Sequence, residues 1–245
     1  MMTEQFRMPD TAVEATPELM ARIKKVNEDA FALHLGVLPA LFLNAKVEKQ
    51  GRTLFDKHYK ANSYTRNYYN FIAYNLLGLT MDGTYGAGHV STKLISGAVR
   101  SWPANGSSIA SLLGTGTMGF GGASTNDTFG IVVGTGAAAE SFEAYAMAGR
   151  IAHGNSAGQL FYNACTQGAG SYDSASKTFS NFLSRTFNNN SGGTIVVAET
   201  GLEDYSLWLT SGSVLDERTL LPSAITVPDA SRLTITYTFT FAFPQ

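Results

Sequence analysis

The sequence predicts a mainly β protein: an antiparallel, jelly-roll-like β-sandwich with an N-terminal helix and one further short helix. Residues 233–243, LTITYTFTFAF, place an apolar side chain at every second position and a threonine or alanine between them. Such alternation in β-branched and aromatic residues predicts a strand with one buried face. We expect this strand to lie inside a sheet, because a long exposed edge would pair with other chains.

The second observation that predicts a β fold is the series of strand-like segments that precedes residue 233. Residues 177–188 (KTFSNFLSRTFN) predict a strand ending in the turn NNNSGG, and residues 194–199 (TIVVAE) are expected to return as its hairpin partner. Short strands are expected at 207–209, 214–221 and 225–227. No helix separates these strands, which favours an antiparallel sheet. Asp216-Glu217-Arg218 is interpreted as a surface turn or a charge cluster at a strand edge.

Composition limits the function classes. Only 15% of the 245 residues are charged and 44% are hydrophobic, and the formal net charge of -2 argues against broad nucleic-acid binding. A single cysteine, Cys165, excludes an intramolecular disulfide framework and a thiolate metal cluster. The N-terminus lacks a signal-type apolar core, and no apolar run reaches transmembrane length. We therefore expect synthesis in the cytoplasm and no membrane partner.

The chain is expected to divide into an N-terminal arm with an amphipathic helix, residues 1–40, and a β domain, residues 41–245. Thr16 is a predicted N-cap followed by Pro17 at the first helical position. The helix has one apolar stripe, and its candidate assembly contacts are Leu19, Ile23, Val26 and Leu33. The sequence leaves two alternatives for the surface on which this stripe packs: the sheet of its own subunit, or a neighbouring subunit.

Residues 41–60 predict a hairpin that turns at Gln50-Gly51. A short helix should follow over residues 63–77, capped by Asn62 or Ser63. Its aromatic residues are interpreted as core rather than as a stacking platform for bases or sugars. Residues 79–128 are rich in glycine, serine and threonine and predict a loop insertion with short strands.

A strand at 129–133 followed by Gly134-Thr-Gly136 has the form of a dinucleotide-binding turn. No acidic residue follows at the distance that ribose binding requires, and no alternating strands and helices follow to build a parallel sheet. We interpret these glycines as turn residues.

Catalytic and metal-ligating patterns are absent from the sequence. The histidines have no ligand spacing, no GxSxG motif occurs, and no paired carboxylates stand in a recognisable setting. His153 is interpreted as a hydrogen-bonded loop histidine, although Glu199 and Asp204 are its alternative spatial partners. We therefore predict no catalytic residue, no cofactor and no metal site.

Five segments of the chain carry a family resemblance. They are LNAKVEKQG with NSYTRNYYNF, then FGIVVGTGAAAESFEAYAMAGRIAHGNSAGQLFY, then SRTFNNNSGGTIVVAETGL, and finally LTITYTFTF. Their order of strand and turn signatures resembles a pattern common in predicted structural proteins of tailed bacteriophages. The resemblance covers about residues 41–78 and 129–243 and includes no catalytic residue.

The resemblance implies a non-enzymatic virion component that self-assembles into a symmetric tail, neck or capsid shell layer. Its partners would be copies of itself and other virion proteins, and its final location the virion after synthesis in the host cytoplasm. The alternative is a receptor- or carbohydrate-binding β-sandwich module of a fibre or baseplate. That module would bind a host surface glycan through the loops rich in tyrosine and asparagine.

Overall fold

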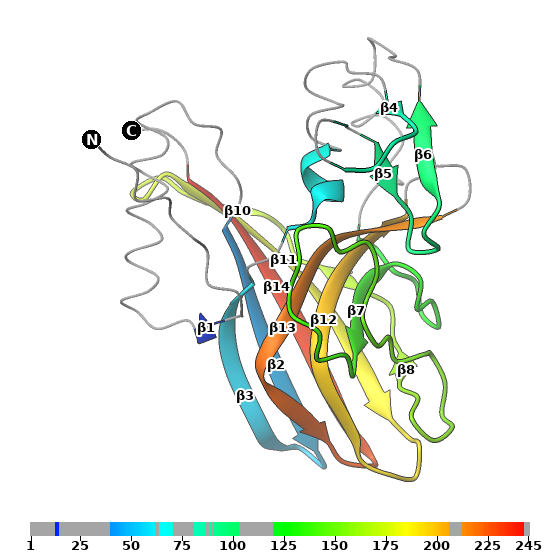
Figure 1. The fold of residues 1–245 in the computed structure, drawn as a ribbon. Coiled ribbons are helices and arrows are strands. Elements are labelled where there is room, and N and C mark those ends of the chain that lie inside the picture. Colours follow the sequence, from blue (N-terminus) through cyan, green and yellow to red (C-terminus); the bar gives the residue numbers. More distant parts are fainter. Residues whose placement is uncertain are drawn as a thin grey trace.

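A computed structural model of the chain describes residues 13–14, 40–61, 64–70, 81–86, 89, 91–102, 120–205 and 212–242. These residues are mainly β and form antiparallel sheets, as the sequence predicts (Figure 1). The predicted N-terminal helix lies outside the described residues, and so do its candidate contacts Leu19, Ile23, Val26 and Leu33.

The larger sheet, sheet A, has the strand order β1-β3-β2-β14-β11-β10, with β8 and β9 also paired to β11. Sheet B has the order β13-β12-β7, and a small third sheet has the order β4-β6-β5. The strands of sheet A are β1 (Val13–Glu14), β2 (Ala40–Lys49), β3 (Arg52–Ala61), β8 (Phe161–Tyr162), β9 (Thr166–Gln167), β10 (Ser171–Asp173), β11 (Thr178–Asn189) and β14 (Ser231–Ala242). The remaining strands are β4 (Met81–Asp82), β5 (Thr92–Lys93), β6 (Val99–Trp102), β7 (Gly130–Gly134), β12 (Ile195–Tyr205) and β13 (Ser213–Val227).

Strand β14 occupies the interior of sheet A, between β2 and β11, which confirms the prediction for this segment. Because apolar and polar side chains alternate along β14, the strand has two different faces. Leu233, Ile235 and Tyr237 are fully buried, whereas the threonines between them are only partly buried. Sheet A therefore has an inner apolar face and an outer face of hydroxyl groups.

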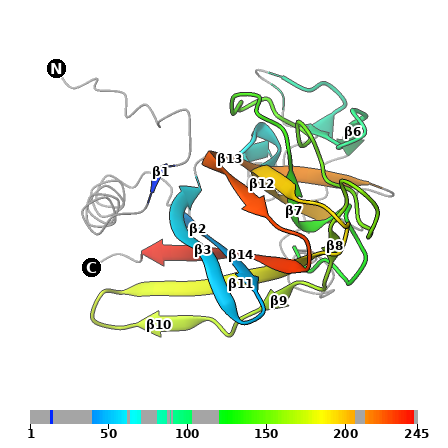
Figure 2. The ribbon, with the colours of Figure 1, turned by 90° about the horizontal axis from the view of Figure 1, so that it is seen from below.

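The inner faces of sheets A and B share one hydrophobic core (Figure 2). Buried aliphatic residues of β2 and β14 in sheet A belong to the same cluster as those of β7, β12 and β13 in sheet B. Polar contacts also cross it; for example, the Tyr237 hydroxyl of β14 lies 3.2 Å from Thr200 Oγ1 of β12. Apolar burial on this scale is the dominant stabilising term.

Strands β11 and β12 do not form the predicted hairpin. β11 pairs with β14 in sheet A, whereas β12 begins sheet B beside β13, with Ile195 opposite Val227. The Asn189 side chain explains the change of sheet: its Nδ2 donates to the carbonyls of Gly193 and Val227, both at 2.8 Å. These hydrogen bonds tie the connection to the far sheet, so the chain crosses the core instead of turning back.

Strand β13 is one long strand where two short ones were predicted at 214–221 and 225–227. Its pairing with β12 shifts register between Val197 and Glu199, opposite the position of Pro222. β13 lies at an edge of sheet B, and an edge strand with a bulge tolerates proline because no ladder hydrogen bond is lost.

The second predicted helix is present in part, because residues 66–70 are helical. The described part of the 79–128 insertion contributes the small β4-β6-β5 sheet. It packs on the β domain through Leu94 against Val214, and the Ile95 amide donates to the Ser213 carbonyl at 3.0 Å. Among the helical residues that the structure describes, none forms a segment with the length and hydropathy to cross a bilayer.

The two faces of β14 should respond differently to truncation. We expect Ile235→Ala to lower the free energy of unfolding by about 2–5 kcal/mol, because it leaves a cavity in the shared core. Thr238→Ala, on the outer face of the same strand, should change it by no more than about 0.5 kcal/mol. Urea denaturation measures both, and equal losses would contradict this assignment of faces.

Candidate binding pocket and buried ionisable residues

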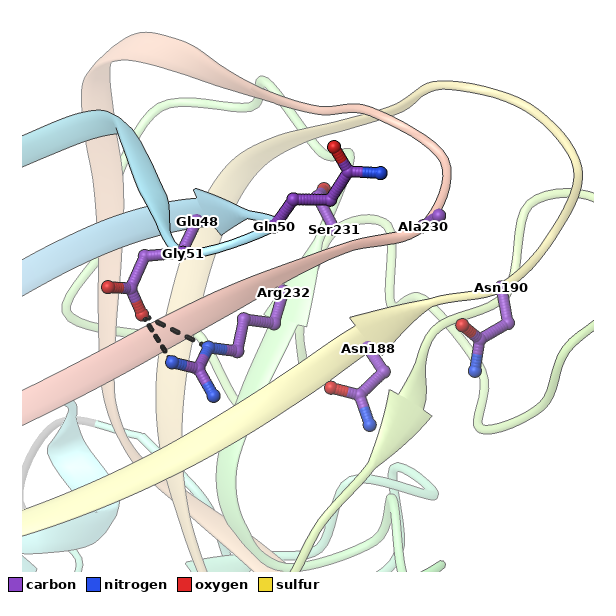
Figure 3. A pocket seen from close by; sticks show the side chains of 8 residues that line it. All are labelled: Glu48, Gln50, Gly51, Asn188, Asn190, Ala230, Ser231 and Arg232. Carbon is purple, nitrogen blue, oxygen red and sulfur yellow. Dashed lines mark hydrogen bonds and ion pairs between the residues drawn. The ribbon is translucent and has the colours of Figure 1, made fainter.

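A polar pocket of about 400 Å³ opens where the β2–β3 and β13–β14 turns meet the end of β11 (Figure 3). Three of its residues form a row across the sheet: Arg232 on β14 pairs with Glu48 on β2 and with Asn188 on β11. Directly opposed residues share a face, so these side chains lie together on the outer face of sheet A. The turns and strand ends supply the rest of the lining: Gln50, Gly51, Asn190, Ala230 and Ser231.

An ion-pair network orients the charged groups of the pocket. The Arg232 guanidinium donates to Glu48 Oε2 from Nε at 3.0 Å and from Nη2 at 2.9 Å, and Lys46 Nζ lies 2.8 Å from Glu48 Oε1. Hydrogen bonds from Lys46 and Arg232 hold the pKa of Glu48 below its usual range. The Arg232 side chain is 58% exposed, and exposed ion pairs contribute little stability. The network therefore fixes side-chain positions at the surface more than it stabilises the fold.

Glu199 lies in a cradle of backbone amides on the opposite side of sheet B from the core. Its Oε1 accepts from the amides of Gly149 at 2.6 Å and Gly136 at 3.2 Å, and its Oε2 accepts from Ala148 at 3.2 Å. Arg218 Nε donates to Oε2 at 2.5 Å. Charge-assisted hydrogen bonds are strong when buried, so this carboxylate anchors the segment that follows β7.

The glycines of the dinucleotide-like motif, Gly134 and Gly136, allow the backbone to approach the Glu199 carboxylate closely. A Cβ atom at Gly134 or Gly136 would lie 2.4 Å from Glu199 Oε1, a distance that allows no side chain. The residues after them, 137–147, are not helical. The interpretation as turn residues is wrong for Gly134, which is the last residue of β7, and Gly136 lies in an irregular connection with no assigned turn. The close backbone approach of both glycines is to a carboxylate of the protein itself.

Arg185 is a buried cation whose hydrogen bonds all go to backbone carbonyls. Its side chain projects from β11 into the space between the sheets and is 1% exposed. It donates to the carbonyls of Ala123, Asn126, Phe129, Ile131 and Asn163. Its guanidinium also lies 4.8 Å from the centroid of the Tyr162 ring. Arginine suits this role because five fixed N–H groups point outward from one plane.

The interpretation of Asp216-Glu217-Arg218 as a surface or edge cluster is wrong. All three residues are buried within β13. Glu217 lies between the sheets, where the Tyr237 hydroxyl donates to its Oε2 at 2.8 Å and Thr219 donates to its Oε1. Arg218 faces the other way and binds Glu199. Glu217 and Arg218 each bind a residue distant in sequence, Tyr237 and Glu199 respectively, which a local charge pattern cannot show.

Burial changes the ionisation of the carboxyls of sheet B. Desolvation raises the pKa of Glu217 to about 8, against the smaller effect of the hydroxyls of Thr219 and Tyr237. Desolvation also raises the pKa of Glu203 to about 7, although Arg150 beside it acts in the opposite direction. The pKa of Asp216 rises for the same reason, with Asp204 and Glu203 adding like-charge repulsion. The sheet therefore holds several carboxyls that keep a proton more tightly when folded.

In the described part of the chain, the side chains that the sequence offers for catalysis or metal binding do not come together in one site. His153 is a hydrogen-bonded loop histidine, as interpreted: its Nδ1 accepts from the Tyr162 amide at 3.1 Å and its own amide donates to Asp127 Oδ2 at 2.7 Å. Within the described ranges, no three His, Cys, Asp or Glu side chains are arranged to hold a metal ion. The absence of catalytic residues, cofactors and metals stays a prediction.

The pocket was not predicted from sequence. Its residues come from three short segments, 48–51, 188–190 and 230–232, that have no common motif. Only the strand register brings them together. The one local feature of the sequence that points to the place of this pocket is the pair of turns at Gln50-Gly51 and before Ser231.

Comparison with known proteins finds no match among family models, curated proteins or solved structures.

Replacing the Arg185 guanidinium should destabilise the fold even when the charge is kept. Arg185→Lys has only three N–H donors, so at least two of the five buried carbonyls lose their partner, at about 1–3 kcal/mol each. We expect the free energy of unfolding to fall by roughly 2–5 kcal/mol in chemical denaturation. The control Arg232→Lys, at an exposed arginine, should change it by less than about 0.5 kcal/mol. Equal effects would show that the carbonyl cluster contributes nothing.

Glu217 should make the folded state less stable as pH rises. Its folded pKa, about 8, lies above that of an unfolded glutamate near 4.5, so the folded state keeps a proton that the unfolded chain releases. The stabilisation is complete below about pH 4.5 and is lost as pH rises through 8, with a slope of up to about 1.4 kcal/mol per pH unit.

Denaturation curves collected between pH 5 and 9 test this linkage. Glu217→Gln should remove part of the downward slope and be relatively more stable at alkaline pH. The control is Glu143→Gln, because a hydrogen bond from Arg66 lowers the pKa of Glu143. That substitution should leave the slope unchanged in this range. A Glu217→Gln curve parallel to the wild-type curve would contradict the raised pKa.

Proposed function

We propose that the chain is a non-enzymatic structural component of a phage virion that self-assembles into a symmetric tail, neck or shell layer. In this proposal the two packed sheets form a jelly-roll-like β-sandwich, and the N-terminal helix is a docking element. The observation that carries the proposal is a strand extension, called the ribbon here: residues 171–182 of β10 and β11 together with residues 238–241 of β14.

The ribbon begins at the margin of the shared core, where Phe239 still packs against it, and most of its residues extend past it. The first buried residue of β11 is Leu183, and none of residues 178–182 is buried. All of β10 is exposed, and residues 238–241 of β14 are only partly buried. Both ribbon drawings show β10 and the adjoining part of β11 running out beyond sheet B (Figures 1 and 2). Strands β11 and β14 are thus longer than the core that they cover.

The ribbon is rich in aromatic side chains. Phe179 and Phe241 face each other across two strands with ring centroids 6.4 Å apart. Tyr172 is 56% exposed and Phe182 is 42% exposed. A narrow antiparallel ribbon without a core is marginally stable in water, and exposed aromatic groups at a sheet edge favour pairing with another chain. A second copy that adds to the ribbon would cover both the edge and the aromatic rings.

The described residues on either side of the predicted N-terminal helix pair with strands at or near the ribbon. Glu14 pairs with Tyr59, and Ala40 pairs with Thr240 within the ribbon itself. Residues 15–39 connect these two points. The proposal therefore assigns the stripe Leu19, Ile23, Val26 and Leu33 to the same assembly contact, on the ribbon of a neighbouring copy.

The non-enzymatic part of the proposal is supported by how the buried polar groups are used. Glu199 and Arg218 bind each other and backbone atoms, and Arg185 binds five carbonyls. Strongly perturbed groups often mark active sites, but ion-pair networks that hold a fold perturb them as well. Here the partners are backbone atoms of connecting segments, which a structural role explains.

Replacing the exposed aromatic side chains of the ribbon tests this proposal. The double variant Tyr172→Ser/Phe182→Ser should shift the protein from oligomer to monomer and keep its melting temperature, because neither residue lies in the core. Light scattering coupled to size exclusion measures mass, and electron micrographs of the wild type should show closed rings or tubes.

The matched control is Leu54→Ser/Val196→Ser, which removes two apolar side chains of similar exposure, 53% and 45%, outside the ribbon. It should assemble like the wild type. A wild-type protein that stays monomeric at high concentration, or a ribbon variant that assembles normally, would overturn the proposal.

A further inference from the structure

The pocket at the turn end of sheet A has the composition of a saccharide site. We propose that it binds a neutral oligosaccharide, with one sugar in the pocket among Glu48, Arg232 and Asn188 and the next against Phe161. This binding goes beyond the assembly role. It uses the end of sheet A opposite to the ribbon, so the two functions can be tested separately.

The charges of the pocket cancel. Glu48 is paired with Arg232, and the adjoining row opposes Lys46 to Asp56 across β2 and β3. An anion such as a phosphate or sulfate would need surplus positive charge, as arginine and lysine clusters supply. A sugar hydroxyl both donates and accepts, so a neutral site that presents a guanidinium beside a carboxylate suits vicinal hydroxyls.

Amide groups complete the polar lining. Figure 3 shows Arg232 between Glu48 and Asn188, with Gln50 and Asn190 at the adjoining turn and strand end. An amide group offers two donors and an acceptor, which again matches hydroxyl groups. No aliphatic side chain larger than that of Ala230 lines the pocket, so lipid or an apolar peptide has little to contact.

Backbone geometry adds a second observation. Gln50 has φ 50° and Ala230 has φ 54°, both in the left-handed region that favours glycine. A non-glycine residue there costs on the order of 1 kcal/mol. At position 50 the chain keeps an amide side chain at the edge of the pocket, where glycine would be the more stable choice. The two-residue β2–β3 turn imposes this conformation and thereby places the Gln50 amide at the pocket.

Phe161 extends the row by one strand. It pairs with Asn188 across β8 and β11, so its ring lies on the same face about 5 Å further along. The His153 ring packs edge-on against it, with the two ring centroids 4.8 Å apart. An apolar ring beside a polar pocket accommodates a sugar, which has a hydroxyl rim and an apolar face of C–H groups.

The first measurement is the binding of the full chain to an array of neutral, sialylated and sulfated glycans. An affinity tag is used to cross-link several copies, so that weak binding to each glycan can be detected. We expect signals from neutral glycans, and isothermal titration with the strongest neutral ligand then gives the affinity. Asn188→Ala and Phe161→Ala should each weaken it about tenfold or more, equivalent to about 1.4 kcal/mol. The control Gln167→Ala, at an exposed amide of β9 outside both the pocket and the ribbon, should bind like the wild type.

Gln50→Gly separates binding from folding. It removes the amide and relieves the left-handed strain, so affinity should fall while the melting temperature stays equal or rises. No neutral glycan above background, binding confined to sialylated or sulfated glycans, or unchanged affinity in the Asn188, Phe161 and Gln50 variants would each overturn the proposal.

Discussion

The hydrogen bonds of Arg185 connect the parts of this protein that the sheets alone leave separate. The side chain begins on sheet A and ends at the Phe129 and Ile131 carbonyls at β7 of sheet B, with further bonds to the segments at 123–126 and 163. A buried guanidinium is tolerated only when its donors are satisfied. This requirement fixes the path of the chain before β7 and after β8, and with it the close packing of Gly122 against Arg185.

The requirement that buried charged groups have hydrogen-bond partners also determines the structure on the outer side of sheet B. Glu199, Glu203 and Arg218 point away from the core but are buried, because residues 134–150 fold over them. Gly136 and Gly149 bring backbone amides to Glu199, and Arg150 pairs with Glu203. The covering segment has no regular secondary structure over most of its length, so charge compensation rather than a strand ladder holds it in place.

Sheet A is longer than the core that it shares, and the proposed assembly role of the ribbon follows from this mismatch. Where β11 and β14 continue past sheet B, aromatic groups stand without a covering sheet among the described strands and form the ribbon. At the other end, the outer-face row of Glu48, Arg232 and Asn188 meets the turns and forms the pocket. The threonines of β14 connect the two ends on a polar face, with Thr234 and Thr186 in hydrogen-bond contact at 3.1 Å.

The sequence by itself determined the elements whose signal is local. Alternation in residues 233–243 gave an interior strand, and Gln50-Gly51 gave the β2–β3 hairpin. Tertiary structure alone decided which strands pair, why Asp216-Glu217-Arg218 is buried, and where the pocket forms. The physical reason is distance along the chain: Glu217 needs Tyr237, Arg218 needs Glu199, and Arg232 meets Glu48 from 184 residues away. Side-chain alternation is a property of neighbouring residues, whereas partner choice and charge compensation depend on contacts that exist only once the sheets have packed.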